Sequence, residues 1–287
     1  MMIPGIVAQR RAAGGAPVLW TPLNMATVPQ IYLDAQDSVV TDVLGFASAI
    51  SNLGAMGSDG DFSQATAGNR PSILAAELNG KRILRFDGAD DCIKCASAAG
   101  LALFRNVPAA WAFTVHKKRG LDGSPTNRIF FYSLDGAGGY RFLLINGNAT
   151  AGRVNKPSMF AKRLDAHSPA GLDSPNVVQG AYCLSLSSIN FSTREAVLRE
   201  NGSVAASTAT LTVDTGNTSN TSSPSMAIGA FHTGVASTDV DLAAIVIGNV
   251  QPSAGEFEKM EGWAAHKYGL TANLPSGHPY KTVAPTV

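Results

Sequence analysis

The chain has 287 residues, a formal net charge of +1 and a charged fraction of 15%. Its charge supplies no global field to attract nucleic acid or an anionic membrane, and no apolar run approaches the roughly 18 residues of a membrane span. We therefore expect no nucleic-acid partner and no membrane insertion, while a hydrophobic content of 45% is enough for a folded core.

The N-terminal residues 1–28 are rich in Pro, Gly and Ala and show little hydrophobic periodicity. We interpret them as an arm rather than a part of the core. Residues 1–11 lack a long apolar stretch after a basic start, so no signal peptide is predicted. The predicted organisation is an arm at 1–28, one domain at 29–270 and a tail at 271–287.

Short strands separated by turn residues fill most of the predicted domain. Residues 110–116 alternate cleanly, which places Trp111 with Phe113 and Val115 on one face. Asn201-Gly202 tolerates the positive φ angles of a type I′ turn and predicts a hairpin. The spacing of about ten residues between strands is typical of a sandwich or barrel. Strands are predicted at 31–35, 81–86, 110–116, 128–134, 140–145, 181–189, 195–200, 203–207, 226–231 and 240–247, with surface loops at 148–180 and 212–224.

One long helix is predicted near the C-terminus. Ser253 and Glu256 have the spacing of a capping box, and Gly269 is placed to end the helix in the left-handed conformation. The helix should pack on the sheet through one apolar face, which consists of Phe257, Met260, Ala264 and Tyr268 with Trp263 at its edge.

Three groups of residues carry a resemblance to a known family. The first is Trp20 and Pro22 followed by Leu33-Asp34-Ala35. The second is Arg70-Pro71 followed by residues 79–91, which contain Phe86-Asp87-Gly88 and Asp90-Asp91. The third is residues 261–270, then Leu274-Pro275 and residues 278–281, His-Pro-Tyr-Lys. Together they resemble the concanavalin A-like lectin/glucanase fold in its laminin G-like form, as found in bacteriophage virion proteins.

The resemblance implies an all-β protein. The expected fold is a concanavalin A-like antiparallel β-sandwich, or jelly roll, with one C-terminal helix packed on it. The resemblance also implies a virion setting, with synthesis in the cytoplasm of a bacterial host.

The carboxylates argue against catalysis. Glycoside hydrolysis needs two carboxylates that flank the scissile bond, and the glucanases of this fold carry them in an E-x-D-x-x-E pattern on one strand. None of the glutamates begins that pattern, and the chain has no Gly-x-Ser-x-Gly elbow, His-Glu-x-x-His motif or Walker loop. We interpret His116, His232 and His266 as structural or solvated and predict no enzymatic activity. The glutamates are Glu77, Glu195, Glu200, Glu256, Glu258 and Glu261.

Asp87, Asp90 and Asp91 form the densest acidic cluster. Clustered carboxylate oxygens are ligands that Ca²⁺ prefers, and some laminin G-like domains bind sugar or protein through calcium. The alternative is a tight turn in which Asp side chains accept main-chain N–H bonds. We favour the turn and keep calcium as the metal alternative, with no other cofactor expected.

The cysteines carry a weaker signal. Cys92-x-x-Cys95 is compatible with zinc or redox chemistry, but no second Cys or His pair has ligand spacing, so we interpret Cys92, Cys95 and Cys183 as ordinary thiols. Thiols of this kind fit a reducing cytoplasm.

Two functional hypotheses follow. A lectin would need aromatic rings that stack on sugars, and Trp111, Tyr132 and Tyr140 are the candidates, although core packing is the commoner fate of strand aromatics. A structural protein would use the arm and the tail to dock on neighbouring subunits. Our prediction is a non-catalytic virion module that contacts other virion proteins, occurs in multiple copies and binds host-surface glycans. The alternative is a lectin or glycan-processing enzyme of the same fold.

Overall fold

The computed structural model describes residues 17–120, 129–137, 139–146, 156–177, 179–231 and 236–287. Residues 1–16 of the predicted arm, Arg128 of a predicted strand and His232 lie outside the described residues. Within the described part, no helix is long and apolar enough to cross a membrane.

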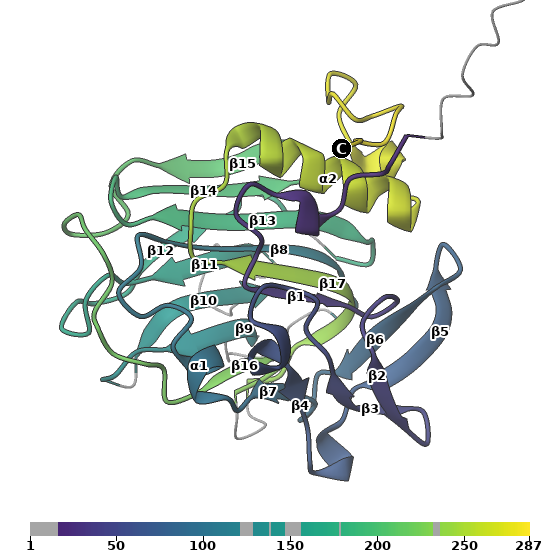
Figure 1. The fold of residues 1–287 in the computed structure, drawn as a ribbon, viewed down its shortest axis with the longest axis horizontal. Coiled ribbons are helices and arrows are strands. Elements are labelled where there is room, and N and C mark those ends of the chain that lie inside the picture. The colour runs from purple at the N-terminus through teal and green to yellow at the C-terminus, as the bar shows by residue number, and fades with distance from the viewer. Residues whose placement is uncertain (1–16, 121–128, 138, 147–155, 178, 232–235) are drawn as a thin grey trace, which may run out of the picture.

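The described residues form 17 strands, all paired antiparallel, and two α-helices (Figure 1). The strands are β1 (Ile31–Asp34), β2 (Val40–Val43), β3 (Phe46–Ile50), β4 (Phe62–Ser63), β5 (Ser72–Leu78), β6 (Lys81–Asp87), β7 (Ile93–Cys95), β8 (Ala109–Lys118), β9 (Ile129–Leu134), β10 (Tyr140–Asn146), β11 (Pro157–Ala161), β12 (Ala170–Asp173), β13 (Cys183–Asn190), β14 (Glu195–Glu200), β15 (Ser203–Thr208), β16 (Met226–Ile228) and β17 (Asp239–Gly248). The helices are α1 (Ala98–Leu101) and α2 (Ala254–Tyr268), and short 3-10 turns occupy Pro22–Asn24, Gly57–Gly60, Ala67–Asn69 and Thr271–Asn273.

The strands form two layers. In the first layer β15, β14, β13, β8 and β17 are successive neighbours, and β17 pairs on its other side with both β1 and β6. In the second layer β12, β11, β10, β9, β16, β7 and β4 are successive neighbours. A single pairing, Phe46 with Ser72, joins the β2–β3 hairpin to β5. The predicted antiparallel β-sandwich is therefore confirmed.

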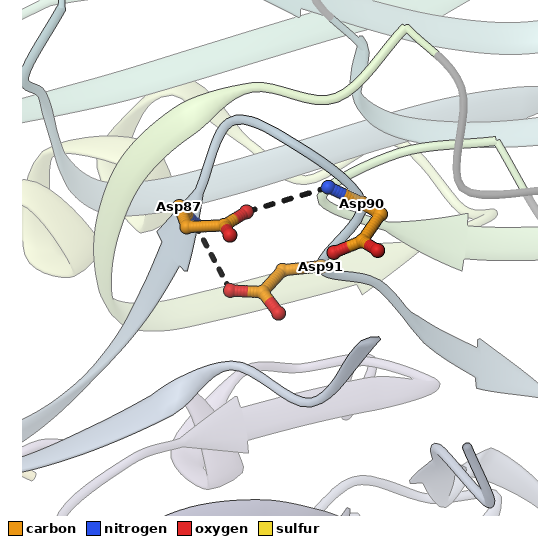
Figure 2. A group of neighbouring side chains, drawn as sticks. All are labelled: Asp87, Asp90 and Asp91. Atoms are coloured by element: carbon orange, nitrogen blue, oxygen red, sulfur yellow. Dashed lines mark hydrogen bonds between the residues drawn. The ribbon is translucent and has the colours of Figure 1, made fainter. Parts of the chain in front are cut away.

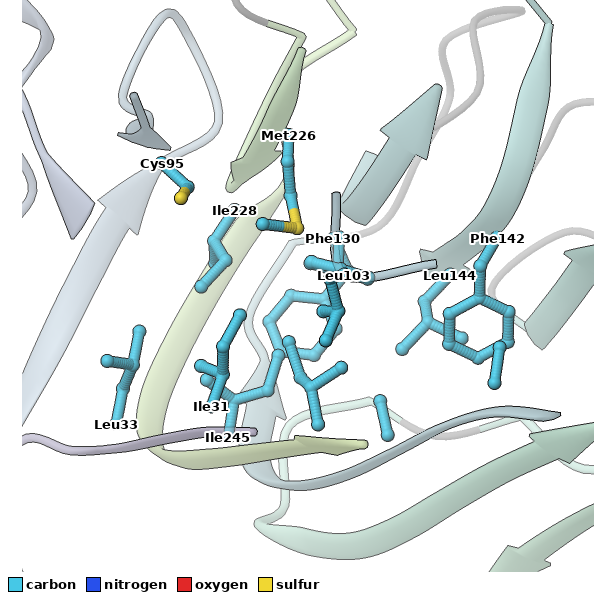
Figure 3. Packing of buried hydrophobic residues seen from close by; sticks show 14 of the residues in the cluster. Ile31, Leu33, Cys95, Leu103, Phe130, Phe142, Leu144, Met226, Ile228 and Ile245 are labelled. Atoms are coloured by element: carbon cyan, nitrogen blue, oxygen red, sulfur yellow. The ribbon is translucent and has the colours of Figure 1, made fainter. Parts of the chain in front are cut away.

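The main hydrophobic core lies between the two layers (Figure 3). Ile31 and Ile245 enter it from the first layer, and Phe142 and Ile228 enter it from the second. The predicted strand at 240–247 is present as β17 and is covered on both faces, because Ile245 faces this core while Val246 faces a second cluster beneath α2.

Helix α2 covers the outer face of the first layer (Figure 1). Ser253 accepts from the main-chain N–H of Glu256, and the side chain of Glu256 returns to the main-chain N–H of Ser253, so the predicted capping box is present. Gly269 ends the helix at φ 71° in the left-handed region, as predicted. The predicted apolar face is buried against β8, β13 and β17, and it contains Phe257, Met260, Ala264 and Tyr268, with Trp263 beside them.

The predicted hairpin is confirmed and one predicted loop is wrong. Strands β14 and β15 are joined through Asn201 at φ 50° and Gly202 at φ 83°, both positive as a type I′ turn requires. The predicted strands at 128–134 and 140–145 correspond to β9 and β10, which also form an antiparallel pair. The segment 148–180 is not simply a loop, because it contains β11 and β12. Residues 212–224 contain no helix or strand, as predicted.

The terminal segments pack against α2. We call residues 17–28 the strap, because Trp20 and Met25 are buried in the cluster beneath and beside the helix. Leu19 pairs with Thr286 in an antiparallel bridge, and Trp20 N–H donates to Pro285 O at 3.0 Å. This part of the predicted arm thus belongs to the core of the molecule, because two large apolar side chains anchor it. The predicted boundaries of arm, domain and tail stay a prediction.

Candidate functional site

The predicted acidic cluster is a tight turn after β6 (Figure 2). Asp87 Oδ1 accepts from the main-chain N–H of Ala89 at 2.8 Å and of Asp90 at 3.4 Å, and Asp91 Oδ2 accepts from the main-chain N–H of Asp87 at 2.9 Å. The carboxylates of Asp87, Asp90 and Asp91 offer oxygen atoms that lie within 4.8 Å of one another. The hydrogen bonds account for the turn without a metal ion.

One carboxyl of this cluster, that of Asp91, is poorly solvated, whereas those of Asp87 and Asp90 reach solvent. Asp91 is 5% exposed, and burial, followed by the nearby charge of Asp87, raises the pKa of its carboxyl to about 7. Ca²⁺ takes six to eight oxygen ligands, whereas two of the oxygens here already accept main-chain N–H bonds. The neighbouring main-chain carbonyl oxygens of Ala89 and Asp90 also accept, from Ser237 and Asn69 respectively. The donor set therefore fits calcium incompletely, and the calcium alternative stays a prediction.

Trp111 does not present a ring face to a ligand. Its side chain is 1% exposed beneath α2, where it packs edge-on against Phe257 at 6.4 Å between ring centroids. Its indole N–H donates to Val250 O at 2.8 Å. This burial removes Trp111 from the sugar-stacking candidates, because stacking needs a solvent-facing ring.

Tyr132 and Tyr140 lie together on the outer face of the second layer. Tyr132 is fully buried, with its hydroxyl 2.8 Å from Ser225 Oγ, and is therefore also removed from the stacking candidates. Tyr140 is half-buried and stacks on Phe231 with 5.7 Å between centroids. Of the three predicted aromatics, only Tyr140 keeps part of its surface in solvent.

An open cavity of about 500 Å³ lies where α2 ends, lined by the strap, the C-terminal tail and the β5–β6 turn. We call it the strap cavity. Trp263, His266 and Lys267 line it from the last turns of α2, and Asn79 and Lys81 line it from the β5–β6 turn. The strap adds Thr21 and the tail adds Pro285. None of these residues was predicted as a site, since no local pattern reveals that four distant segments meet.

The charges around the strap cavity balance. The Lys267 ammonium lies 2.5 Å from Asp34 Oδ2 and 2.5 Å from Asp37 Oδ2, while its charge lies over the Trp263 ring at 5.4 Å. Asp34 is fully buried below the cavity. Lys81, which lines the opposite wall, forms no ion pair with any described residue. Two ammonium groups and two carboxylates leave no net charge to select a strongly ionised ligand.

Two tyrosines contact the aspartate that pairs with Lys267. The hydroxyls of Tyr268 and Tyr32 donate to Asp34 Oδ2 at 2.8 and 3.2 Å. Burial and the adjacent carboxylate raise the pKa of both phenols far above the usual range, so both remain donors. The aspartate thereby holds Lys267 and the end of α2 in a fixed position.

A second cavity of about 500 Å³ lies near the other end of α2. We call it the β15 groove. It is bounded by the outer surfaces of β13, β14 and β15 and by the loop before α2, and its polar lining consists of Ser188, Asn190, Glu195, Ser207, Thr208 and Gln251.

The glutamates of α2 have structural partners. Glu256 Oε1 accepts from the main-chain N–H of Ala26 in the strap at 2.8 Å. Glu261 is buried and receives two 2.8 Å hydrogen bonds from Arg199, with His278 Nε2 at 3.2 Å. These contacts join the helix to the strap, to β14 and to the tail.

Among the described residues, the histidines and cysteines considered in the sequence are buried or have structural partners. His116 is buried, and burial, followed by the charge of Lys118, lowers its pKa to about 4. His266 Nε2 lies 2.9 Å from Tyr280 O, at the rim of the strap cavity. The three cysteines are buried and unbridged, and burial raises the pKa of each thiol, which opposes thiolate chemistry.

Comparisons with known proteins identify similar folds. No family model matches the chain, and no curated protein matches it. The binding domain of Paraclostridial Mosquitocidal Protein 1 has a TM-score of 0.54 at 10% identity, over 80% of this chain and 52% of that one. The botulinum neurotoxin serotype G binding domain has a TM-score of 0.50 at 9% identity, over 81% and 50%.

A third similar structure is the CBM40 of a Ruminococcus gnavus IT-sialidase bound to α2,3-sialyllactose, with a TM-score of 0.47 at 13% identity over 61% of this chain and 94% of that one. The chain spans about half the length of the two toxin binding domains. At identities this low, the similarity to the two toxin binding domains shows a shared fold alone.

Proposed function

We propose that this chain is a non-catalytic carbohydrate-binding β-sandwich, and that the strap cavity is its saccharide site. The observation that carries the proposal is the composition of that cavity. A volume of about 500 Å³ lies within the range of small-ligand sites. The fold supports a binding role, which the similar toxin domains also have.

The lining suits a sugar. Saccharide rings offer apolar C–H faces beside hydroxyls that both donate and accept hydrogen bonds. Trp263, which is 7% exposed, contributes a small apolar surface, while Asn79, Thr21 and Lys81 supply polar groups around it. Because the charges of Lys81 and Lys267 are matched by Asp34 and Asp37, hydrogen bonding rather than net charge selects the ligand.

The absence of catalysis is part of this proposal. The Glu256 and Glu261 carboxylates of α2 are engaged in the helix cap and in the contact with Arg199, and neither lines the cavity. A hydrolase would need a free pair of carboxylates at the bond to be cleaved. Incubation of the protein with the glycans that it binds should therefore release no reducing sugar.

A glycan array of neutral and sialylated structures tests the proposal. A hydrogen bond from a charged group contributes about 1.5–3 kcal/mol, so Lys81→Met should weaken the binding of any captured glycan by about 10- to 100-fold. Lys259→Met is the matched control, because Lys259 is half-exposed on the same α2 helix and lies outside the cavity lining. A blank array, or equal losses in both variants, contradicts the strap cavity as the saccharide site.

A second candidate function is a virion structural module. The sequence resemblance supports it, and so does the pairing of the strap with the C-terminal tail, where Leu19 bridges to Thr286. Exposed apolar side chains gather in these paired segments, namely Val18, Leu19, Val283 and Val287. In a particle-assembly assay, removal of residues 1–19 should abolish incorporation while the sandwich still melts cooperatively. Normal incorporation of the truncated protein would exclude the paired segments as the anchor.

A further inference from the structure

We propose that the β15 groove is a second saccharide site, selective for neutral polyhydroxylated ligands. This inference rests on the proposed carbohydrate-binding function and adds a separate place of contact. The groove lies near the start of α2, whereas the strap cavity lies at its end. A helix of 15 residues is about 22 Å long, so the two cavities share no wall.

The polar groups of the groove are already oriented. Asn190 Oδ1 accepts from the main-chain N–H groups of Ser192 at 2.9 Å and Thr193 at 3.3 Å. Since main-chain N–H groups only donate, the amide oxygen must face the turn and the amide NH₂ must face away from it. No described residue accepts from that NH₂. The side chain is therefore held with two donors left for a ligand.

Gln251 and Glu195 complete the arrangement. Ser188 Oγ donates to Gln251 Oε1 at 2.9 Å, which leaves the Gln251 NH₂ without a partner among the described residues. Glu195 Oε2 accepts from Thr193 Oγ1 at 2.9 Å, and its second oxygen accepts from no described group. The groove thus combines fixed amide donors with one carboxylate acceptor.

This combination selects a chemical class. A phosphate or sulfate would meet Glu195 and no cationic side chain in the lining. A flat aromatic ligand would find no aromatic wall. Sugar hydroxyls can accept from the amides and donate to the carboxylate at the same time. Without an aromatic wall each contact is weak, so the groove should strengthen binding chiefly for glycans that also occupy the strap cavity.

The test is an NMR titration of the whole protein that follows the side-chain NH₂ signals of Asn190 and Gln251. The probes are the methyl glycosides of glucose, galactose and mannose at tens of millimolar, with inorganic phosphate as the anionic comparison. At least one glycoside should shift both signals, and phosphate should shift neither. If no glycoside shifts them, or if phosphate shifts them as strongly, the proposal is overturned.

Variants separate the two cavities. Gln251→Met removes the amide with little change in size and should weaken glycoside binding, as followed by the Asn190 signal, by about 2- to 12-fold. Lys81→Met in the strap cavity should leave that shift unchanged. If a glycoside shifts the Asn190 and Gln251 signals while Lys81→Met has no effect on the glycan array, the strap cavity is not a saccharide site and the proposal for the β15 groove stands. A shift of Asn190 that is unchanged in Gln251→Met would refute the groove alone.

Discussion

The Asp34→Asn variant tests how the helix α2 is held on the sandwich. Asp34 ends β1, is 0% exposed, and accepts from Lys267 Nζ at 2.5 Å and Tyr268 Oη at 2.8 Å. Its other oxygen accepts from the main-chain N–H of Gln36 at 2.9 Å. An amide in its place keeps one acceptor but either turns N–H donors toward the ammonium or leaves the main-chain groups unpaired. The variant should fold and be markedly less stable.

The size of the loss follows from burial. Removal of one partner from a buried ion pair costs about 3–5 kcal/mol. Lys267 keeps a second carboxylate, Asp37, and its side chain is 13% exposed, so we expect the lower end, about 3 kcal/mol. At about 2–4 °C per kcal/mol for a domain of this size, the melting temperature should fall by about 6–12 °C.

Thermal and urea unfolding followed by circular dichroism provide the measurement. Asp37→Asn is the matched control, because Asp37 lies at the same 2.5 Å from the same ammonium but has a side chain that is 53% exposed. Its loss should stay below about 1 kcal/mol, as for other solvated ion pairs. A double-mutant cycle with Lys267→Met isolates the pairwise part. Equal losses for Asp34→Asn and Asp37→Asn would refute the reasoning, since it depends on burial.

Three further predictions address packing and pH. In Gly262→Ala the new Cβ would lie 2.4 Å from Tyr280 Cβ, so the melting temperature should fall and amide exchange over residues 278–281 should accelerate. The control is Gly255→Ala, which should be neutral or stabilising because nothing lies within 4 Å of the new Cβ. The pKa of Asp91 is about 7 in the folded state, above the value of about 3.9 in the unfolded state. Its contribution to the free energy of unfolding is therefore present at low pH and is lost as the pH rises through 7. In urea titrations at several pH values, Asp91→Asn should reduce this fall in the free energy of unfolding. Trp111→Phe should lower stability by about 1–3 kcal/mol through the lost indole hydrogen bond, while calorimetric glycan affinity stays unchanged; a selective loss of affinity would restore Trp111 as a binding residue.

The elements that could be predicted from the sequence are those with local signals. Ser253 and Gly269 mark the two ends of α2 through capping and left-handed geometry, and Asn201-Gly202 marks the β14–β15 hairpin. Strands β11 and β12 were missed because their order comes from pairing with β10 and with each other, whereas their own sequences, Pro-Ser-Met-Phe-Ala and Ala-Gly-Leu-Asp, are short and lack a clean alternation. Periodicity likewise could not show that the strap docks through Trp20 and Met25.

The candidate sites were less predictable than the fold. Alternation along β8 correctly grouped Trp111 with its neighbours on one face, but it could not show that α2 covers that face. The strap cavity requires the strap, the β5–β6 turn, α2 and the tail to be placed together, and its polar residues are unremarkable in the sequence. The acidic turn was recognisable because Asp87 and Asp91 are close in sequence and bond within one turn.

The sequence motifs that carry the family resemblance have a common structural role. Asp34 of the first motif contacts Lys267 of the helix motif across 233 positions of sequence. Glu261 contacts His278 of the terminal motif, and Lys281 Nζ donates to the carbonyl oxygens of the 3-10 turn and loop that follow α2. These contacts attach the helix, strap and tail to the outer face of the sandwich. The motifs therefore indicate how α2, the strap and the tail are attached to the sandwich, which is why they predicted the fold. The β15 groove depends on residues such as Asn190 and Gln251, which lie outside the motifs.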